Sequence, residues 1–186
     1  VASMDLFIMS KAWLMEQVKE HVAHNMYHMD RDLVMGLWQK GKATINVYRY
    51  DGIAMFNESL EEYFHNSLAL TKKEVREDLF GRCHPVYTKV RDDMPTRYGE
   101  NANVINSLVA DGCVIEGTVE NSILARGVCV APDAHVKNCI IMQDGQIHSG
   151  AYIENCILDK QAIIKRNARL IGPAAYPIVI AKNVVI

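Results

Sequence analysis

The hexapeptide Val-Glu-Asn-Ser-Ile-Leu at residues 119–124 decides the fold, because it returns twice further along the chain. Residues 136–141 read Val-Lys-Asn-Cys-Ile-Ile, and residues 153–158 read Ile-Glu-Asn-Cys-Ile-Leu, so the step from 119 to 136 equals the step from 136 to 153. An earlier copy, Val-Ile-Asn-Ser-Leu-Val, occupies residues 104–109, and its step to position 119 is slightly shorter. A fixed period of this kind indicates a repeat architecture in which stacked units share one core.

Within one repeat, the aliphatic residues are spaced for three short strands. Val119, Leu124, Val130 and Val136 follow one another at intervals of five, six and six. One inward-facing side chain per strand gives each coil a triangular cross-section, and the many β-branched residues favour strands over helices. The pattern therefore predicts a parallel β-helix of hexapeptide repeats over residues 100–186.

Three further sets of residues recur with the repeat. One asparagine per coil is expected to form a ladder with amides bonded from coil to coil. The ladder positions are Asn106, Asn121, Asn138 and Asn155, each followed by one of Ser107, Ser122, Cys139 and Cys156. Small residues are expected at tight corners, at Ala134, Ala151 and Ala168. Glycines are expected where φ is positive or the backbone is crowded, at Gly112, Gly127, Gly145 and Gly150.

The N-terminal part of the chain, up to position 80, alternates between strand and helix patterns. Strands are expected at residues 4–9, 43–50 and 53–56. One helix is expected to begin after Ser10 as its N-cap, and a second to run from Asp30 as its N-cap to Gly41. A third helix would carry Leu60, Tyr63, Phe64 and Leu68 on one face. This order suits the trailing part of an α/β domain, a partial Rossmann-like remnant.

A Pro- and Gly-containing stretch separates the two patterns. Residues 81–99 include Pro85, Pro95 and Gly99, which is typical of a linker. The expected domains are therefore an α/β remnant at residues 1–80, a linker at 81–99 and a β-helix at 100–186. Since the chain starts at Val1 without an initiator methionine, we expect the α/β part to continue a longer domain.

Composition excludes several functional classes. The 186 residues carry 20 basic and 22 acidic side chains, a net charge of −2, so no dominant nucleic-acid or membrane surface is expected. No apolar run approaches the roughly 18 residues that span a bilayer. Five cysteines without a Cys-x-x-Cys pair argue against a disulfide framework or a zinc ribbon.

Two groups of histidines are candidates for chemistry. His21, His24 and His28 share one helical face, where neutral imidazoles could bind a metal; without a cysteine or an HExxH motif, a solvated face is favoured. His135 and His148 lie in the repeats, where a histidine between coils could act as a general base. Nothing nearby in the sequence orients either ring, which disfavours that role.

A basic cluster follows the last clear repeat. Its members are Lys160, Lys165, Arg166 and Arg169, with Lys182 further on. Such a cluster suits an anionic ligand or an acidic partner. The alternative is a solvated surface, since exposed charges contribute little.

Taken together, these segments resemble the C-terminal half of glucose-1-phosphate adenylyltransferase (ADP-glucose pyrophosphorylase). Ala2-Ser3-Met4 before an apolar run is similar to the family's ASMGIYVF strand, and Arg31-Asp32-Leu33-Val34 to its KDLIP helix start. Pro85-Val86-Tyr87-Thr88 is similar to its PIYT signature. The resemblance implies a left-handed β-helix behind a nucleotidyltransferase domain, a cytoplasmic tetramer and a role in bacterial glycogen synthesis.

The chain departs from the family at positions that matter for catalysis. Where active members read GYWRDVGT, residues 52–59 place Phe56 at the aspartate that helps to hold magnesium and Ala54 at the tryptophan. His28-Met29 replaces an Asp-Phe pair that contacts the sugar, and only Ser3 remains of the glucose-phosphate contacts in this half. A phenyl ring offers no oxygen to a hard cation. We therefore expect no catalytic or metal-binding residue here, and magnesium only in an active family member.

These departures resemble the non-catalytic, regulatory type of subunit, which pairs with a homologous catalytic subunit. Family members bind anionic allosteric effectors near the β-helix, and the resemblance assigns this role to Lys160 and Lys182. The alternatives are an active sugar-phosphate nucleotidyltransferase, a hexapeptide-repeat acyltransferase that binds coenzyme A as a homotrimer, and a pure assembly module.

Overall fold

The computed structural model describes residues 3–81, 85–88 and 92–186. It divides into two compact units, Val1–Ala54 and Met55–Ile186, and each is described by itself. Cys83 and part of the predicted linker lie outside the described residues. None of the helices in the described part is long and apolar enough to cross a membrane.

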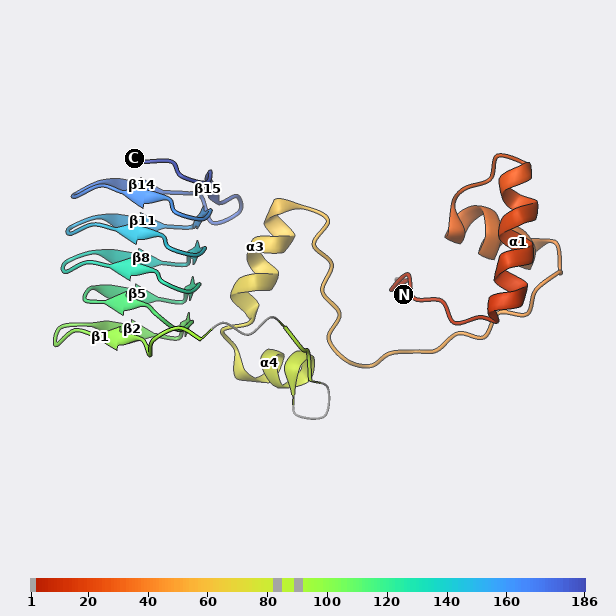
Figure 1. Cartoon of the computed structure of the whole chain (residues 1–186), viewed down its shortest axis with the longest axis horizontal. Helices are drawn as coiled ribbons and strands as arrows, with labels where there is room; N and C mark the ends of the chain where they lie inside the picture. The colour runs from red at the N-terminus through yellow and green to blue at the C-terminus, as the bar shows by residue number, and fades with distance from the viewer. Residues whose placement is uncertain (1–2, 82–84, 89–91) are drawn as a thin grey trace. The chain divides into compact units, whose positions relative to one another are not determined.

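The second unit is built on a stack of parallel coils with three faces (Figure 1). Its described strands form three five-stranded sheets, in which all pairings are parallel. Sheet 1 contains β1 (Arg97–Tyr98), β4 (Val114–Ile115), β7 (Cys129–Val130), β10 (Gln146–Ile147) and β13 (Ile163–Ile164). Sheet 2 contains β2 (Asn103–Ile105), β5 (Thr118–Glu120), β8 (His135–Lys137), β11 (Tyr152–Glu154) and β14 (Arg169–Ile171). Sheet 3 contains β3 (Leu108–Val109), β6 (Ile123–Leu124), β9 (Ile140–Ile141), β12 (Cys156–Leu158) and β15 (Ile178–Ile180). The predicted parallel β-helix is confirmed.

The core of the β-helix is the set of inward aliphatic side chains read from the repeat. Val119, Leu124, Val130 and Val136 are all at most 1% exposed. The register places Val119 opposite Val136, and Val136 opposite Ile153, so like stacks on like. Each such side chain stabilises the fold by about 1.5–3 kcal/mol through burial.

The predicted asparagine ladder is present. Asn106 Nδ2 donates to Asn121 Oδ1 over 2.9 Å, Asn121 to Asn138 over 2.7 Å, and Asn138 to Asn155 over 3.2 Å. Asn155 donates to the carbonyl of Gly172 over 2.9 Å. All four asparagines have positive φ, a conformation that asparagine tolerates better than most residues. One residue type thus turns the chain and joins successive coils.

A tight corner explains why the first step of the repeat is shorter than the later ones. Gly117 takes this corner, between β4 and β5, and a Cβ there would lie 2.4 Å from the Ala134 carbonyl oxygen. Only glycine fits so close an approach. In later coils the corners are longer, and Ala134 and Ala151 are fully buried in them.

Two helices of the second unit precede the coils (Figure 1). Helix α3 (Leu60–Ala69) is capped by Ser59, whose side chain accepts from Glu62 N, and Phe64 packs against Ile140 and Ile157. Helix α4 (Lys73–Phe80) was not predicted. The Arg76 guanidinium fixes the turn between them through 2.7 Å bonds to two carbonyls.

In the first unit, the described residues 3–54 form only helices and irregular segments. They are α1 (Lys11–Ala23), the π-helix η1 (Met29–Met35) and α2 (Gly36–Gln39). Ser10 accepts a hydrogen bond from Trp13 N, as predicted for the N-cap of α1. Asp30 is not the second N-cap: His28 takes that place, and Asp30 lies inside η1. Gly41 has φ of +64° just after α2 ends, which fits the predicted helix end.

The strands predicted at residues 4–9, 43–50 and 53–56 are wrong, since none of these segments is a strand. Leu6 and Ile8, which a buried strand would hide, are 79% and 103% exposed. A strand exists only with a hydrogen-bonded neighbour, and the described part of the first unit supplies none.

The boundary between the compact units, after Ala54, lies earlier than the limits predicted for the domains. The reason is physical: α3 packs on the β-helix through Phe64. Within the predicted linker, β1 already pairs with β4. The domain limits 1–80, 81–99 and 100–186 stay a prediction about the longer protein.

Candidate functional site

Lys160 and Lys182 lie at the same corner of adjacent coils. Strands β12 and β15 pair with Leu158 opposite Ile180, and the N–H of Asn183 donates to the Lys160 carbonyl over 3.1 Å. Both lysine side chains are exposed. The register therefore joins two cations that are more than one regular repeat apart in the sequence.

The spacing of this lysine corner suits a small anion. Paired strands are about 4.8 Å apart, so two ammonium groups on adjacent coils can reach one phosphate-sized group. Asp159 is the acid beside them, and its Oδ1 accepts from the backbone N–H of Lys160 over 2.7 Å. Two exposed ammonium groups and one carboxylate leave a net positive corner, where lysines act as point charges on an anion.

The other predicted cations do not join this corner. Lys165 and Arg166 follow β13 and stand at the next corner, both exposed. Arg169 lies on sheet 2, where its guanidinium carbon is 5.1 Å from the centre of the Tyr152 ring. The basic cluster of the sequence is therefore split into three places.

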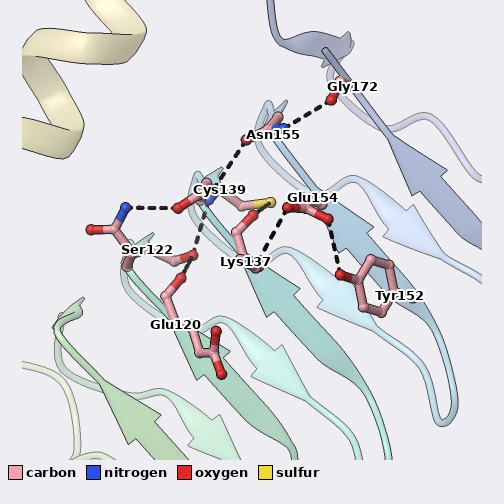
Figure 2. A network of polar contacts seen from close by, with 10 residues as sticks. Glu120, Ser122, Lys137, Cys139, Tyr152, Glu154, Asn155 and Gly172 are labelled. Atoms are coloured by element: carbon pink, nitrogen blue, oxygen red, sulfur yellow. Dashed lines mark hydrogen bonds and ion pairs between the residues drawn. The ribbon is translucent and has the colours of Figure 1, made fainter. Parts of the chain in front are cut away.

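Arg169 belongs to a network that the sequence reading missed. Tyr152 donates to Glu154 over 2.9 Å, and Glu154 pairs with Lys137 over 3.5 Å on the outer face of sheet 2 (Figure 2). The hydrogen bond to Glu154 raises the pKa of Tyr152, so the phenol stays protonated. The signal was available, since His135, Tyr152 and Arg169 follow the same step as the repeat. These groups satisfy one another, which is typical of a structural cluster.

The serine and cysteine side chains that follow the ladder asparagines also have a structural role. Ser122 Oγ accepts from Cys139 N over 2.9 Å and donates to the Glu120 carbonyl over 2.7 Å (Figure 2). Cys139 and Cys156 are fully buried, and burial raises the pKa of the Cys139 thiol. Such a thiol is inert as a nucleophile. The four described cysteines form no disulfide.

The histidine candidates do not assemble a site. His21 is buried, with Nδ1 2.8 Å from the Gln17 carbonyl oxygen, so the expectation of a fully solvated face is wrong for it. In the described ranges no cluster of three or more His, Cys, Asp or Glu could hold a metal. His135 and His148 are exposed, and no hydrogen bond orients either ring in the described part of the chain.

Ser3 and His28 lie in the first unit. Ser3 Oγ accepts from the N–H of Asp5 over 3.1 Å and is exposed. His28 lines a cavity of about 120 Å³ together with His21 and Asp32. The Asp32 carboxylate accepts from the N–H groups of Tyr27 and His28, each over 3.1 Å. Its hydrogen bond from Arg31 and the backbone bond from His28 lower the pKa of Asp32 to about 2.

Phe56 lies just before α3, in the segment 52–59 that was compared with the GYWRDVGT motif on resemblance. Asn66 Nδ2 donates to its carbonyl over 2.6 Å and to Asn57 Oδ1 over 3.1 Å. The nearest carboxylate in the sequence after it is that of Glu58. The Phe56 ring, 38% exposed, gives a divalent cation no ligand.

The repeat and the triangular coils define a class, that of hexapeptide-repeat β-helix proteins. The family model of GlmU-like C-terminal hexapeptide domains matches residues 90–174. Over nearly the whole chain the similarity is more specific. The glycogen biosynthesis protein GlgD of Bacillus subtilis is 38% identical over 183 residues, which are 98% of this chain and 52% of that protein.

Two further relatives agree. GlgD of Geobacillus stearothermophilus is 52% identical over 71 residues, 38% of this chain and 21% of that protein. A glucose-1-phosphate adenylyltransferase of Desulfitobacterium hafniense is 24% identical over 172 residues, 91% of this chain and 43% of that enzyme. The resemblance to the glucose-1-phosphate adenylyltransferase family, and within it to GlgD, is therefore confirmed. The chain spans about half the length of these longer matches.

Proposed function

We propose that this chain is the C-terminal part of a regulatory subunit in glycogen biosynthesis. The whole subunit would modulate a homologous catalytic partner that makes ADP-glucose from glucose 1-phosphate and ATP, within a cytoplasmic tetramer. The similarity to GlgD over 98% of the chain supports the regulatory type. The observation that carries the proposal is Phe56, which stands where an active member needs a magnesium ligand.

The residues support binding better than catalysis. Magnesium, when bound in an active relative, neutralises charge on the transferring phosphates. Along the described chain no residue cluster suited to a metal replaces the missing ligand. Ser3 keeps a hydroxyl for a sugar phosphate, whereas His28 and Met29 give that ligand neither the carboxylate nor the ring of active members.

The lysine corner is the proposed effector site. Lys160 and Lys182 would hold an anionic effector such as a sugar phosphate, inorganic phosphate or AMP. Their exposure leaves the ammonium groups accessible, and the register holds them at one corner. Two lysine contacts to a phosphate contribute more than one because the charges act together.

Mixing the full-length protein with the active homologue tests the proposal. We expect a complex whose effector response or KM differs from that of the homologue alone. In the Lys160→Ala/Lys182→Ala variant the complex should persist while the effector response falls. Lys165→Ala, an exposed lysine at another corner of the same coil, is the matched control. Kinetics that are unaltered by the full-length protein would contradict the proposal.

A further inference from the structure

Helix α3 is attached to the β-helix at two places. Phe64, only 2% exposed, packs on Ile140 and Ile157, which point outward from β9 and β12. Just after the helix, the Thr71 hydroxyl accepts from Asn106 Nδ2 over 3.4 Å and lies 3.3 Å from Asn121 Oδ1. An apolar contact on sheet 3 and a polar contact to the asparagine ladder therefore hold the helix along its length.

The other end of α3 holds the segment before it. We call residues 56–59 the clamped segment. Asn66 bonds the Phe56 carbonyl and the Asn57 side chain. Glu62 Oε2 accepts from Glu58 N over 2.9 Å, while Ser59 Oγ accepts from Glu62 N over 3.1 Å. This resembles a reciprocal capping box, and each bond requires that α3 be folded.

A helix of this length does not fold by itself. Helix α3 has 10 residues, and isolated helices shorter than about 12–15 residues are marginal in water. Its hydrogen-bonded turns therefore persist because Phe64 and Thr71 dock them on the β-helix. The clamped segment, which adjoins the first unit in sequence, depends for its position on the second.

We propose that the β-helix, through Phe64 on α3 and Thr71 just after it, is the support that positions the clamped segment, and that Asn66 is the positioning residue. The same fold that stacks the coils thereby fixes the backbone at Phe56. This inference concerns the docked helix alone and does not rest on the proposed function.

Amide hydrogen exchange of the full chain tests the inference. In Asn66→Ala, which loses both hydrogen bonds to the clamped segment, the Glu58 amide should exchange about fivefold to tenfold faster, while strands β5 to β12 stay unchanged. In Phe64→Ala, both α3 and the Glu58 amide should exchange faster. Glu74→Ala, at an exposed position on α4, should alter neither.

Two results would overturn the inference. One is faster exchange in α3 of Phe64→Ala with the Glu58 amide unchanged, which would show that the segment is held independently. The other is exchange of the Glu58 amide, which donates to Glu62, at an unprotected rate in the unmodified chain. If Phe64→Ala also accelerates exchange in the coils, Phe64→Leu keeps the comparison, since it retains an apolar side chain and should give a smaller increase in the same two segments.

Discussion

The two units of this chain differ in where they find partners for their apolar side chains. Among the described residues, the buried hydrophobic side chains of the first unit are Leu33 and Leu37, whereas the β-helix buries a continuous column through its coils. A repeat supplies each strand with a neighbour from the same chain. The first unit has strand-like sequences without strand neighbours, and there Leu6 and Ile8 are exposed.

The contrast teaches that pattern alone does not make a strand. Residues 4–9 are as apolar as many β-helix strands, yet they are irregular. Position in a ladder decides the outcome, because backbone groups must be paired before an extended segment becomes stable. Four predictions use this contrast, and both tryptophans, Trp13 and Trp38, report on the first unit separately.

The largest effect is expected from truncation in the core. Ile153→Ala should lower the free energy of unfolding of the β-helix by about 2–5 kcal/mol, because it loses transfer energy and leaves a cavity. Ile8→Ala, at a fully exposed position, should change stability by less than about 0.5 kcal/mol. Urea unfolding followed by far-UV circular dichroism and by tryptophan fluorescence measures both. Equal effects would remove the contrast.

The ladder should come next in size. Asn138→Ala loses two amide hydrogen bonds and forces alanine to a φ of +48°, at a cost of about 2–4 kcal/mol. Asn138→Gly relieves the backbone strain and should recover about 1 kcal/mol. Asn25→Ala, at a φ of +58° in the first unit, should cost the strain and one exposed hydrogen bond from the Tyr27 hydroxyl, and so less than Asn138→Ala. Thermal unfolding checks the order, and a harmless Asn138→Ala would show that the ladder contributes nothing.

Removing a helix N-cap should cost less stability, and the cost should be similar in the two units. Ser59→Ala and Ser10→Ala each remove the acceptor for one backbone N–H, which costs about 1 kcal/mol. Ser59→Ala should lower the stability of the second unit, and Ser10→Ala should alter tryptophan fluorescence of the first. Replacing each serine by threonine, another N-cap residue, serves as the control. A loss in both signals from either variant would mean that the units unfold together.

The smallest effect concerns pH in the first unit. The folded-state pKa of Asp32 is lowered from 3.8 to about 2 by the hydrogen bond from Arg31 and by the backbone N–H of His28. The ionised Asp32 carboxylate therefore contributes fully to the stability of the folded first unit above about pH 4, and this contribution is lost as the pH falls through 2. NMR titration of the Tyr27 and His28 amides should follow this carboxylate, whereas Asp32→Asn should abolish the transition. A titration midpoint near pH 3.8 would contradict the hydrogen bonds that Asp32 accepts in the folded state.

Much of the second unit was predictable, for a physical reason. Equivalent positions of successive repeats stack on one another, so the period of the sequence predicts both the core positions and the ladder positions. Val119 was therefore placed correctly in the core and Asn121 in the asparagine ladder. Helix α4 was missed because its apolar residues are few and none is buried. In the first unit, Asp30 was a plausible N-cap, but the carboxylate of Asp32, slightly later in the chain, binds the backbone N–H groups that precede the helix.

The candidate site was only partly predictable. The sequence marked Lys160 and Lys182 as separate matches, and an insertion makes the step between them longer than the regular repeat, so only the strand register shows that they share a corner. Arg169 was placed with them because it is near in sequence, whereas sheet 2 turns it toward Tyr152. The side chains that meet at these sites lie on adjacent coils, and they are therefore separated in the sequence by about one repeat.

The central claim is the proposal that the whole subunit regulates a catalytic partner and does not itself catalyse. The most direct measurement is ADP-glucose synthesis by the purified full-length protein alone, with magnesium, ATP and glucose 1-phosphate, beside the active homologue under the same conditions. The proposed loss of a magnesium ligand at Phe56 predicts a rate that is lower by orders of magnitude. A rate comparable with that of the active homologue would contradict the claim.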